Sequence, residues 1–261
     1  MNLNYLGILT LLTYLSVALA QGLHLLGKLS CSCWRYRAGS LLAITSHGWI
    51  LYKLIETPQG QNLAWLIMLS FTLWLMNVFT FIMSIRAPIA NLCVLTYPLS
   101  AISLGFALYF GGHEVINTKT QLGVLAHILI SFFAISLLAL ASLQALLLGL
   151  QNFLLKHHRP SPILQFLPPL QTMEGLLFLI IWSGMLFLSA SLVSGFVFQV
   201  GLTASYLLPK SILALCAWIL LTLLLLGRYF FGWRGPTAVR WTLSGTLLAI
   251  LSYFGTKALL L

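Results

Sequence analysis

The sequence predicts an all-α integral membrane protein, a bundle of about eight transmembrane helices forming a single domain over residues 1–261. The composition is the first observation behind this class. Hydrophobic residues make up 60% of the chain and charged residues 6%, with a mean hydropathy of +1.01. Soluble domains of this length do not have such a composition. The second observation is that the apolar residues occur in long runs of about 20, the length that crosses a bilayer.

The expected spans follow from the positions of these runs, with ends set to about ±3 residues. Proline and glycine clusters such as Pro58-Gln59-Gly60 and Gly235-Pro236 stand at their boundaries, where these residues interrupt a helix at least cost. The first run has no basic residue before it, so we interpret it as a helix rather than a signal peptide. The expected spans are residues 3–26, 38–55, 62–85, 88–110, 121–150, 173–198, 210–230 and 236–258.

The charge pattern predicts the orientation. The net charge is +10, from 13 Lys and Arg against three Glu and no Asp, and it lies in short loops. The first, third, fifth and seventh loops hold nine basic residues and the others three, which places the odd loops in the cytoplasm and both termini outside. A positive-inside bias of this kind indicates contact with the lipid bilayer and gives no reason to expect nucleic acid binding.

The long run at residues 121–155 has a face suited to helix packing. Its small and polar residues recur at spacings of three, four or seven, which brings them onto one side of a helix. Small residues let helices approach closely in lipid, and an imidazole facing hydrocarbon is costly, so we expect His127 to point inward. The residues of this face are His127, Ser131, Ala134, Ala141, Ala145 and Gly149.

Two histidines are the candidate ligands of the bundle. His47 lies in the middle of the second span and His127 near the outer end of the fifth. Two neutral imidazoles facing one another between helices can provide the axial ligands of haem iron. Each could equally hydrogen-bond a hydroxyl or carbonyl group on a neighbouring helix, and the sequence leaves both interpretations open.

Carboxylates are too few to support most alternative functions. Without Asp and with three Glu, the chain lacks the groups used in ion-coupled transport, and no nucleophile, base and orienting acid can be assembled. We therefore expect no enzymatic activity. Glu174 follows Pro168-Pro169 at the start of the sixth span, where a negative charge stabilises a helix N-terminus.

The last third of the chain carries a motif that resembles a known family. The stretch from Gly227 to Ala238 reads GRYFFGWRGPTA, and Trp241 to Gly245 follows as WTLSG. Together with KHHRP at 156–160 and LPPLQTME at 167–174, it resembles the cytochrome c assembly membrane family that includes CcsA, ResC and HemX. The similarity is greatest to the YpjD-like branch of bacterial inner-membrane proteins, and it implies a multi-pass protein of that membrane.

The resemblance implies a role near haem. CcsA-like members present haem for attachment to apocytochrome c through a tryptophan-rich outer loop flanked by histidines, and His127 matches the first of these. Here residues 199–210 contain no Trp, Asp or His, so the presentation loop is missing. His47 is then the remaining partner for His127. The basic residues Arg228, Arg234 and Arg240 are expected near a haem propionate, a lipid headgroup or a protein partner.

Three functions remain open from the sequence. The first is a protein that binds or passes haem between its helices, with His127 and His47 as iron ligands. The second is a HemX-like accessory or regulatory scaffold that holds another membrane or haem-biosynthesis protein without carrying haem. The third, a small-molecule transporter, is allowed by any polytopic chain, but no pair of broken helices recommends it.

Overall fold

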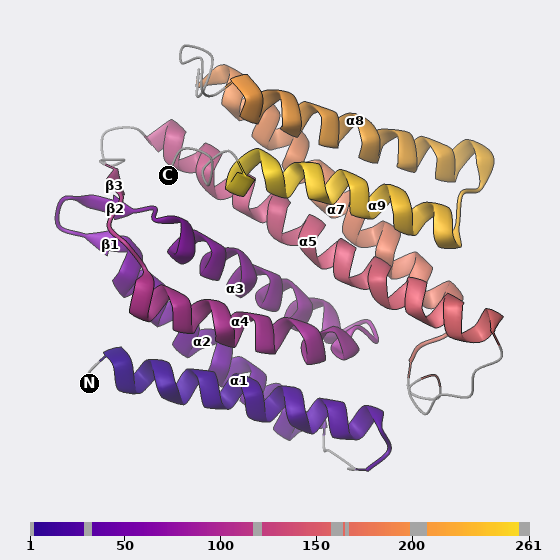
Figure 1. The fold of residues 1–261 in the computed structure, drawn as a ribbon, viewed down its shortest axis with the longest axis horizontal. Coiled ribbons are helices and arrows are strands. Elements are labelled where there is room, and N and C mark those ends of the chain that lie inside the picture. Colours follow the sequence, from indigo (N-terminus) through magenta and orange to yellow (C-terminus); the bar gives the residue numbers. More distant parts are fainter. Residues whose placement is uncertain are drawn as a thin grey trace. The chain divides into compact units, whose positions relative to one another are not determined.

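The computed structural model describes residues 3–28, 33–116, 122–157, 164, 167–198 and 208–255, and these are largely helical (Figure 1). The chain divides into two compact units, each described here by itself. Unit 1 comprises residues 1–120 with 160–167, and unit 2 comprises residues 121–159 with 168–261. The sequence analysis predicted a single domain over residues 1–261, without a division into units.

Unit 1 is built from four long helices. α1 (Leu3–Leu25) packs against α2 (Cys33–Ile55) and α4 (Cys93–Phe110), and α3 (Trp65–Ser84) packs against α2 and α4. A short 3₁₀ helix, η1 (Ala90–Leu92), leads directly into α4. The aromatic residues Tyr14 and Tyr97 are fully buried where α1 and α4 meet, next to Cys93. Tyrosine and cysteine therefore occupy positions where aliphatic residues usually fill a membrane helix interface.

Unit 1 also contains a small sheet that the all-α prediction did not include. The strands β1 (Glu56–Thr57), β2 (Gly60–Asn62) and β3 (Val115–Ile116) pair antiparallel in the order β1-β2-β3. The buried Asn62 side chain holds this end together: its Nδ2 donates to Gly112 O, and its Oδ1 accepts from the main-chain N–H groups of Ala64 and Glu114. Asn62 thereby ties the α2–α3 connection to the segment that follows α4.

Unit 2 contains the long helix α5 (Leu122–Lys156), followed by α7 (Leu170–Val197), α8 (Leu208–Phe231), α9 (Gly235–Ile250) and a final π-helical turn η2 (Leu251–Gly255). α5 packs against both α7 and α9, and α8 packs against α9 and α7. The predicted packing face of α5 is confirmed at its three alanines, because Ala134, Ala141 and Ala145 are all fully buried.

Glycine on the facing helix completes the close approach of α5 and α7. A Cβ atom built on Gly184 of α7 would lie 2.8 Å from Cδ2 of Leu138, so only glycine fits there without a shift of Leu138. α9 is joined to the same region of α5, since the hydroxyl group of Thr246 donates to Leu138 O at 3.2 Å. Close backbone approach of this kind is typical of helices that associate in lipid.

Six of the described helices are long and apolar enough to cross a membrane: Leu3–Leu25, Trp65–Ser84, Ala90–Phe110, Gly123–Lys156, Leu170–Val197 and Lys210–Phe231. The two other predicted spans are helical as well, as α2 and α9. However, α2 carries Arg35, Arg37 and Lys53, and α9 has 16 residues. The helical membrane class is therefore confirmed, while the count of eight spans and the outer placement of both termini stay predictions.

Candidate functional site

His127 lies at the interface of α5 and α7, where its ring packs against Gly195 of α7. The imidazole is half-buried, and its Nδ1 lies 3.0 Å from the hydroxyl oxygen of Ser194 on α7. A Cβ atom on Gly195 would stand 3.1 Å from Cε1 of this ring, closer than most side-chain contacts. The ring therefore packs directly against the α7 backbone, and any larger residue at 195 would press on it. The inward orientation expected from the sequence is present within unit 2.

Serine hydroxyl groups fix the surroundings of this histidine. Ser131 donates to the main-chain oxygen of His127 at 2.7 Å and lies 2.6 Å from the hydroxyl group of Ser191. Ser194 in turn donates to Ser191 O at 3.0 Å. The Ser131–Ser191 and His127–Ser194 hydrogen bonds join α5 to α7, whereas the other two lie within one helix. Three serines thus form a polar seam at the His127 end of the α5–α7 interface.

Hydrogen bonds orient the imidazole of His127. Metal-bound histidines commonly use one ring nitrogen for the metal and bond the other to a nearby acceptor, which fixes the ring orientation. Ser194 engages Nδ1, and the Ser191 main chain also hydrogen-bonds the imidazole. The ring is thus oriented from the α7 side. No group of three or more His, Cys, Asp or Glu that could hold a bare metal ion occurs among the described residues.

His47 lies in unit 1 in a very different environment. It is fully buried, its Nδ1 lies 3.2 Å from the Tyr14 hydroxyl group, and its Nε2 lies 3.0 Å from that of Ser70. Both ring nitrogens are thus engaged, so binding iron would break one of these bonds. The arrangement favours the hydrogen-bonding interpretation of His47 that the sequence left open. A shared iron between His47 and His127 stays a prediction, because the two residues belong to different units.

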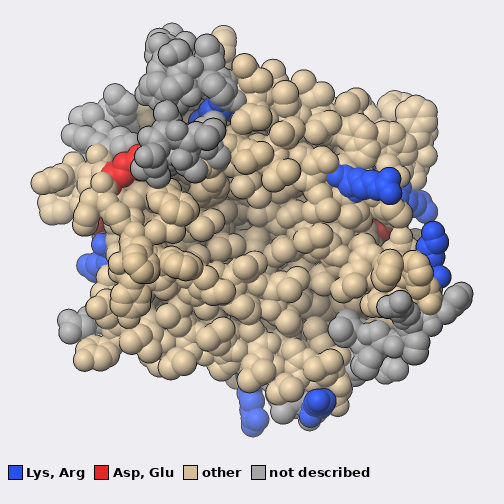
Figure 2. All heavy atoms as spheres, in the orientation of Figure 1, with Lys and Arg blue, Asp and Glu red and all other residues tan. Residues whose placement is uncertain are grey.

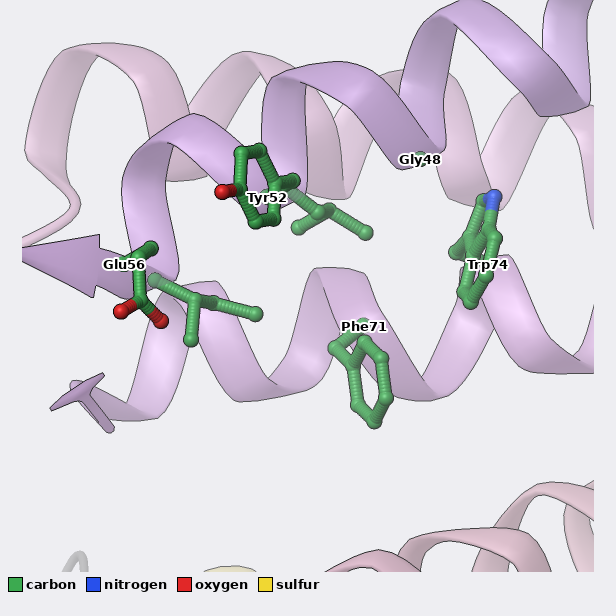
Figure 3. Close-up of a pocket in the computed structure, with 7 residues that line it drawn as sticks. Gly48, Tyr52, Glu56, Phe71 and Trp74 are labelled. Atoms are coloured by element: carbon green, nitrogen blue, oxygen red, sulfur yellow. The ribbon is translucent and has the colours of Figure 1, made fainter. Parts of the chain in front are cut away.

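A pocket lies close to His47 in sequence but does not include it. Its volume is about 240 Å³, and the wall is largely apolar, with Tyr52 and Glu56 of the α2–β1 segment facing Phe71 and Trp74 of α3 (Figure 3). The indole of Trp74 closes one end, packed over Gly48 and donating to Ile44 O at 2.8 Å. Ligand pockets usually measure about 300–1,000 Å³. This pocket is therefore too small to enclose a haem.

The C-terminal motif forms the turn between α8 and α9. Gly227 has no side chain because the indole ring of Trp233 occupies that space, and Trp233 N donates to Gly227 O at 3.2 Å. Gly232 and Gly235 adopt the left-handed conformation, with φ of +66° and +53°. Trp233 also packs on Trp241, with ring centroids 5.2 Å apart. Each glycine of this motif thus serves the turn geometry.

Of the three arginines Arg228, Arg234 and Arg240, Arg228 contacts other residues of unit 2. Its guanidinium group lies 4.5 Å from the centre of the Phe178 ring, a cation–π contact, and donates to Trp233 O at 3.4 Å. Arg234 and Arg240 are exposed at the start of α9. Figure 2 shows that Lys and Arg occupy few places on a largely uncharged face, mostly near its edges. Arg234 and Arg240 are thus free to contact groups outside the chain.

Glu174 caps a different helix from the one expected. Its side chain is buried, 8% exposed, and Oε1 accepts the Gly235 main-chain N–H at 2.8 Å. Gly235 is the first residue of α9, so the carboxylate compensates the positive end of α9, whereas the sequence suggested the start of its own helix. The two residues are far apart in the chain, and no local pattern connects them. Glu174 thereby anchors the α8–α9 turn to α7.

The fold and this site define a polytopic membrane protein of packed helices, with one oriented histidine between α5 and α7. The family model described as "Cytochrome C assembly protein" matches residues 34–261. This chain therefore belongs to the cytochrome c assembly protein family, and it is a multi-pass protein of the inner membrane.

Two relatives illustrate the similarity. The "Inner membrane protein YpjD" of Escherichia coli (strain K12) is 29% identical over 229 residues, which cover 86% of each chain. The "Uncharacterized 28.8 kDa protein in nifR3-like 5'region" of Azospirillum brasilense is 32% identical over 133 residues, 50% of this chain and 49% of that protein. No solved structure matches this chain.

Proposed function

We propose that this protein binds haem in unit 2 and that the imidazole of His127 is an axial ligand of the iron. The observation that carries the proposal is the environment of His127. Its Nδ1 lies 3.0 Å from the Ser194 hydroxyl oxygen, and its ring packs against Gly195, which has no side chain to displace it. Haem would supply an iron centre that accepts an imidazole nitrogen. Membership in the cytochrome c assembly family supports a haem-related role.

The arginines fit a contact with headgroups or a partner better than with a haem held at His127. Near the start of α9, Val239 packs against Gly149 of α5. His127 precedes Gly149 in the same helix by a distance of roughly 33 Å, at about 1.5 Å per residue. Arg234 and Arg240 therefore lie near the opposite end of unit 2. We propose that they bind lipid phosphates or an acidic protein surface.

We also propose that the role is non-catalytic. The sequence contains three Glu and no Asp, and one of these, Glu174, is committed to the cap of α9. Proton transfer or hydrolysis would need a positioned base with its partner. The residues around His127 are instead serines and a glycine. The serine hydroxyl groups form hydrogen bonds next to the ring, and the glycine leaves space for it. This arrangement is suited to holding a ligand.

The test is a hemin titration of the detergent-purified protein, followed by its Soret absorption. We expect wild type to bind hemin and His127→Ala to lose most of the ligand-field signature of a bound imidazole. His47→Ala is the matched control, since it removes the same side chain from unit 1, where both ring nitrogens already have partners. Equal loss in the two variants would contradict a specific role of His127.

The second candidate is an accessory scaffold that carries no haem. Two observations favour it: His47 is fully hydrogen-bonded, and the pocket beside α2 measures about 240 Å³. In that case wild type would stay colourless with excess hemin. It would also retain a haem-biosynthesis or membrane protein through Arg234 and Arg240, and this association would weaken in the double variant Arg234→Gln with Arg240→Gln.

A further inference from the structure

One end of unit 2 brings the ends of several helices together (Figure 1). His127 lies near the start of α5, Ser194 near the end of α7 and Lys210 near the start of α8. The chain returns to the same end in η2, where the Tyr253 ring packs edge-on against Phe132 of α5, with ring centroids 4.8 Å apart. The end of unit 2 that holds His127 therefore also receives a basic side chain.

An aromatic ring holds Lys210 at this end. Its Nζ lies 4.5 Å from the centre of the Tyr253 ring, a cation–π contact. Tyr253 in turn contacts Phe132, which follows His127 by five residues in α5. The Lys210 ammonium group is close enough to the His127 imidazole for an electrostatic interaction between the two. A cation and the proposed iron ligand therefore border the same part of unit 2.

The acidic side chains of the protein lie elsewhere. The chain contains three Glu and no Asp, and Glu56 and Glu114 belong to unit 1. Glu174 is then the single acidic side chain of unit 2, and it is committed to the cap of α9. It precedes Ser194 in α7 by a distance of about 30 Å, at about 1.5 Å per residue. Lys210 is therefore suited to a carboxylate that comes from outside the chain.

The other described Lys and Arg residues of unit 2 lie toward its opposite end. Lys156 is the last residue of α5, and the arginines surround the turn between α8 and α9. Glu174 near the start of α7 bonds to that turn, whereas Ser194 near the end of α7 bonds to His127. Among the described Lys and Arg residues of unit 2, Lys210 is thus the one near His127.

We propose that Lys210 binds a propionate group of haem, an inference that rests on the proposed role of His127 as iron ligand. Haem carries propionate groups, so a haem held at His127 brings carboxylates to this end of unit 2. The ammonium group of a lysine has three donors on a flexible stem and forms charge-assisted hydrogen bonds with carboxylate oxygens. Lys210 then makes the propionate contact that the sequence offered to the three arginines.

Two probes separate the propionate contact from the bond to iron. One is hemin, and the other is hemin dimethyl ester, in which the propionate carboxylates are esterified and uncharged. Each is titrated into the detergent-purified full-length protein and followed by Soret absorption. We expect Lys210→Met to bind hemin about tenfold more weakly than wild type, as for the loss of one charge-assisted hydrogen bond, and to bind the ester as wild type does.

Two further variants serve as controls. Lys210→Arg keeps the positive charge, and we expect it to retain most of the affinity for hemin. Lys156→Met removes the same type of side chain from the far end of α5, where it is exposed, and we expect both affinities to stay at the wild-type value. Since each probe is compared between variants, its partition into detergent cancels.

The outcomes distinguish this inference from the proposed function. Hemin that shows the axial imidazole signal and binds Lys210→Met as tightly as wild type would overturn the Lys210 contact alone. An equal loss of hemin and ester in Lys210→Met would also overturn it, because the side chain would then act on the structure of the site. A wild type that binds hemin without an axial imidazole signal would overturn the role of His127, and the Lys210 contact with it.

Discussion

The cap of α9 by Glu174 makes a prediction whose size follows from the structure. Glu174→Ala removes the acceptor of a buried 2.8 Å hydrogen bond and leaves the Gly235 N–H unpaired. A hydrogen bond to a charged group contributes about 1.5–3 kcal/mol, and each kcal/mol shifts the melting temperature by about 2–4 °C in a chain near this size. We therefore expect the melting temperature of the purified protein to fall by about 3–12 °C.

Two further variants separate the charge from the hydrogen bond. Glu174→Gln keeps an oxygen of similar reach but no charge, and we expect roughly half the loss, because charge-assisted bonds are about twice as strong as neutral ones. Glu114→Ala is the control, since that side chain is exposed, in the segment just before β3 of unit 1. Thermal unfolding monitored by circular dichroism measures all three. If Glu174→Ala and Glu114→Ala have the same melting temperature, the capping explanation is refuted.

Three more predictions follow from glycine positions and from charge. Gly235→Ala should cost about 1–2 kcal/mol in unfolding free energy through its φ of +53° alone, since the nearest atoms to the new Cβ are 3.8 Å away. Gly195→Ala should weaken hemin binding by displacing the His127 ring, whereas Gly175→Ala, with nothing within 4 Å of its Cβ, should not. A C-terminal alkaline phosphatase fusion should be active, and inactivity would contradict the outer placement of the C-terminus.

The lengths of the apolar runs were sufficient to predict the long helices, and periodicity predicted the packing face of α5. Ala134, Ala141 and Ala145 are spaced for one side of a helix, and all three are fully buried. The small sheet was not predicted, because strands of two or three residues show no alternating pattern. Asn62, which organises this end of unit 1, was expected to begin the third span, 62–85, whereas it is the last residue of β2.

The partners of the polar side chains could not be predicted, because they come from other helices. The hydrogen-bond partner of His127 is Ser194, which lies 67 residues later in the chain. His47 bonds to Tyr14, 33 residues before it. Glu174 bonds to Gly235, 61 residues after it. Local spacing does not determine which helices become neighbours. The start of α9 was marked locally, because Gly235-Pro236 was expected at a helix boundary and α9 begins at Gly235.

The most direct test of the central claim is chemical rescue at the proposed iron ligand. His127→Gly removes the imidazole and leaves space beside Gly195, so added imidazole can take its place. We predict that hemin bound to this variant loses the axial imidazole signal in electron paramagnetic resonance and that millimolar imidazole restores it, while His47→Gly keeps the wild-type spectrum throughout. An unchanged spectrum in His127→Gly would contradict the assignment of His127 as the iron ligand.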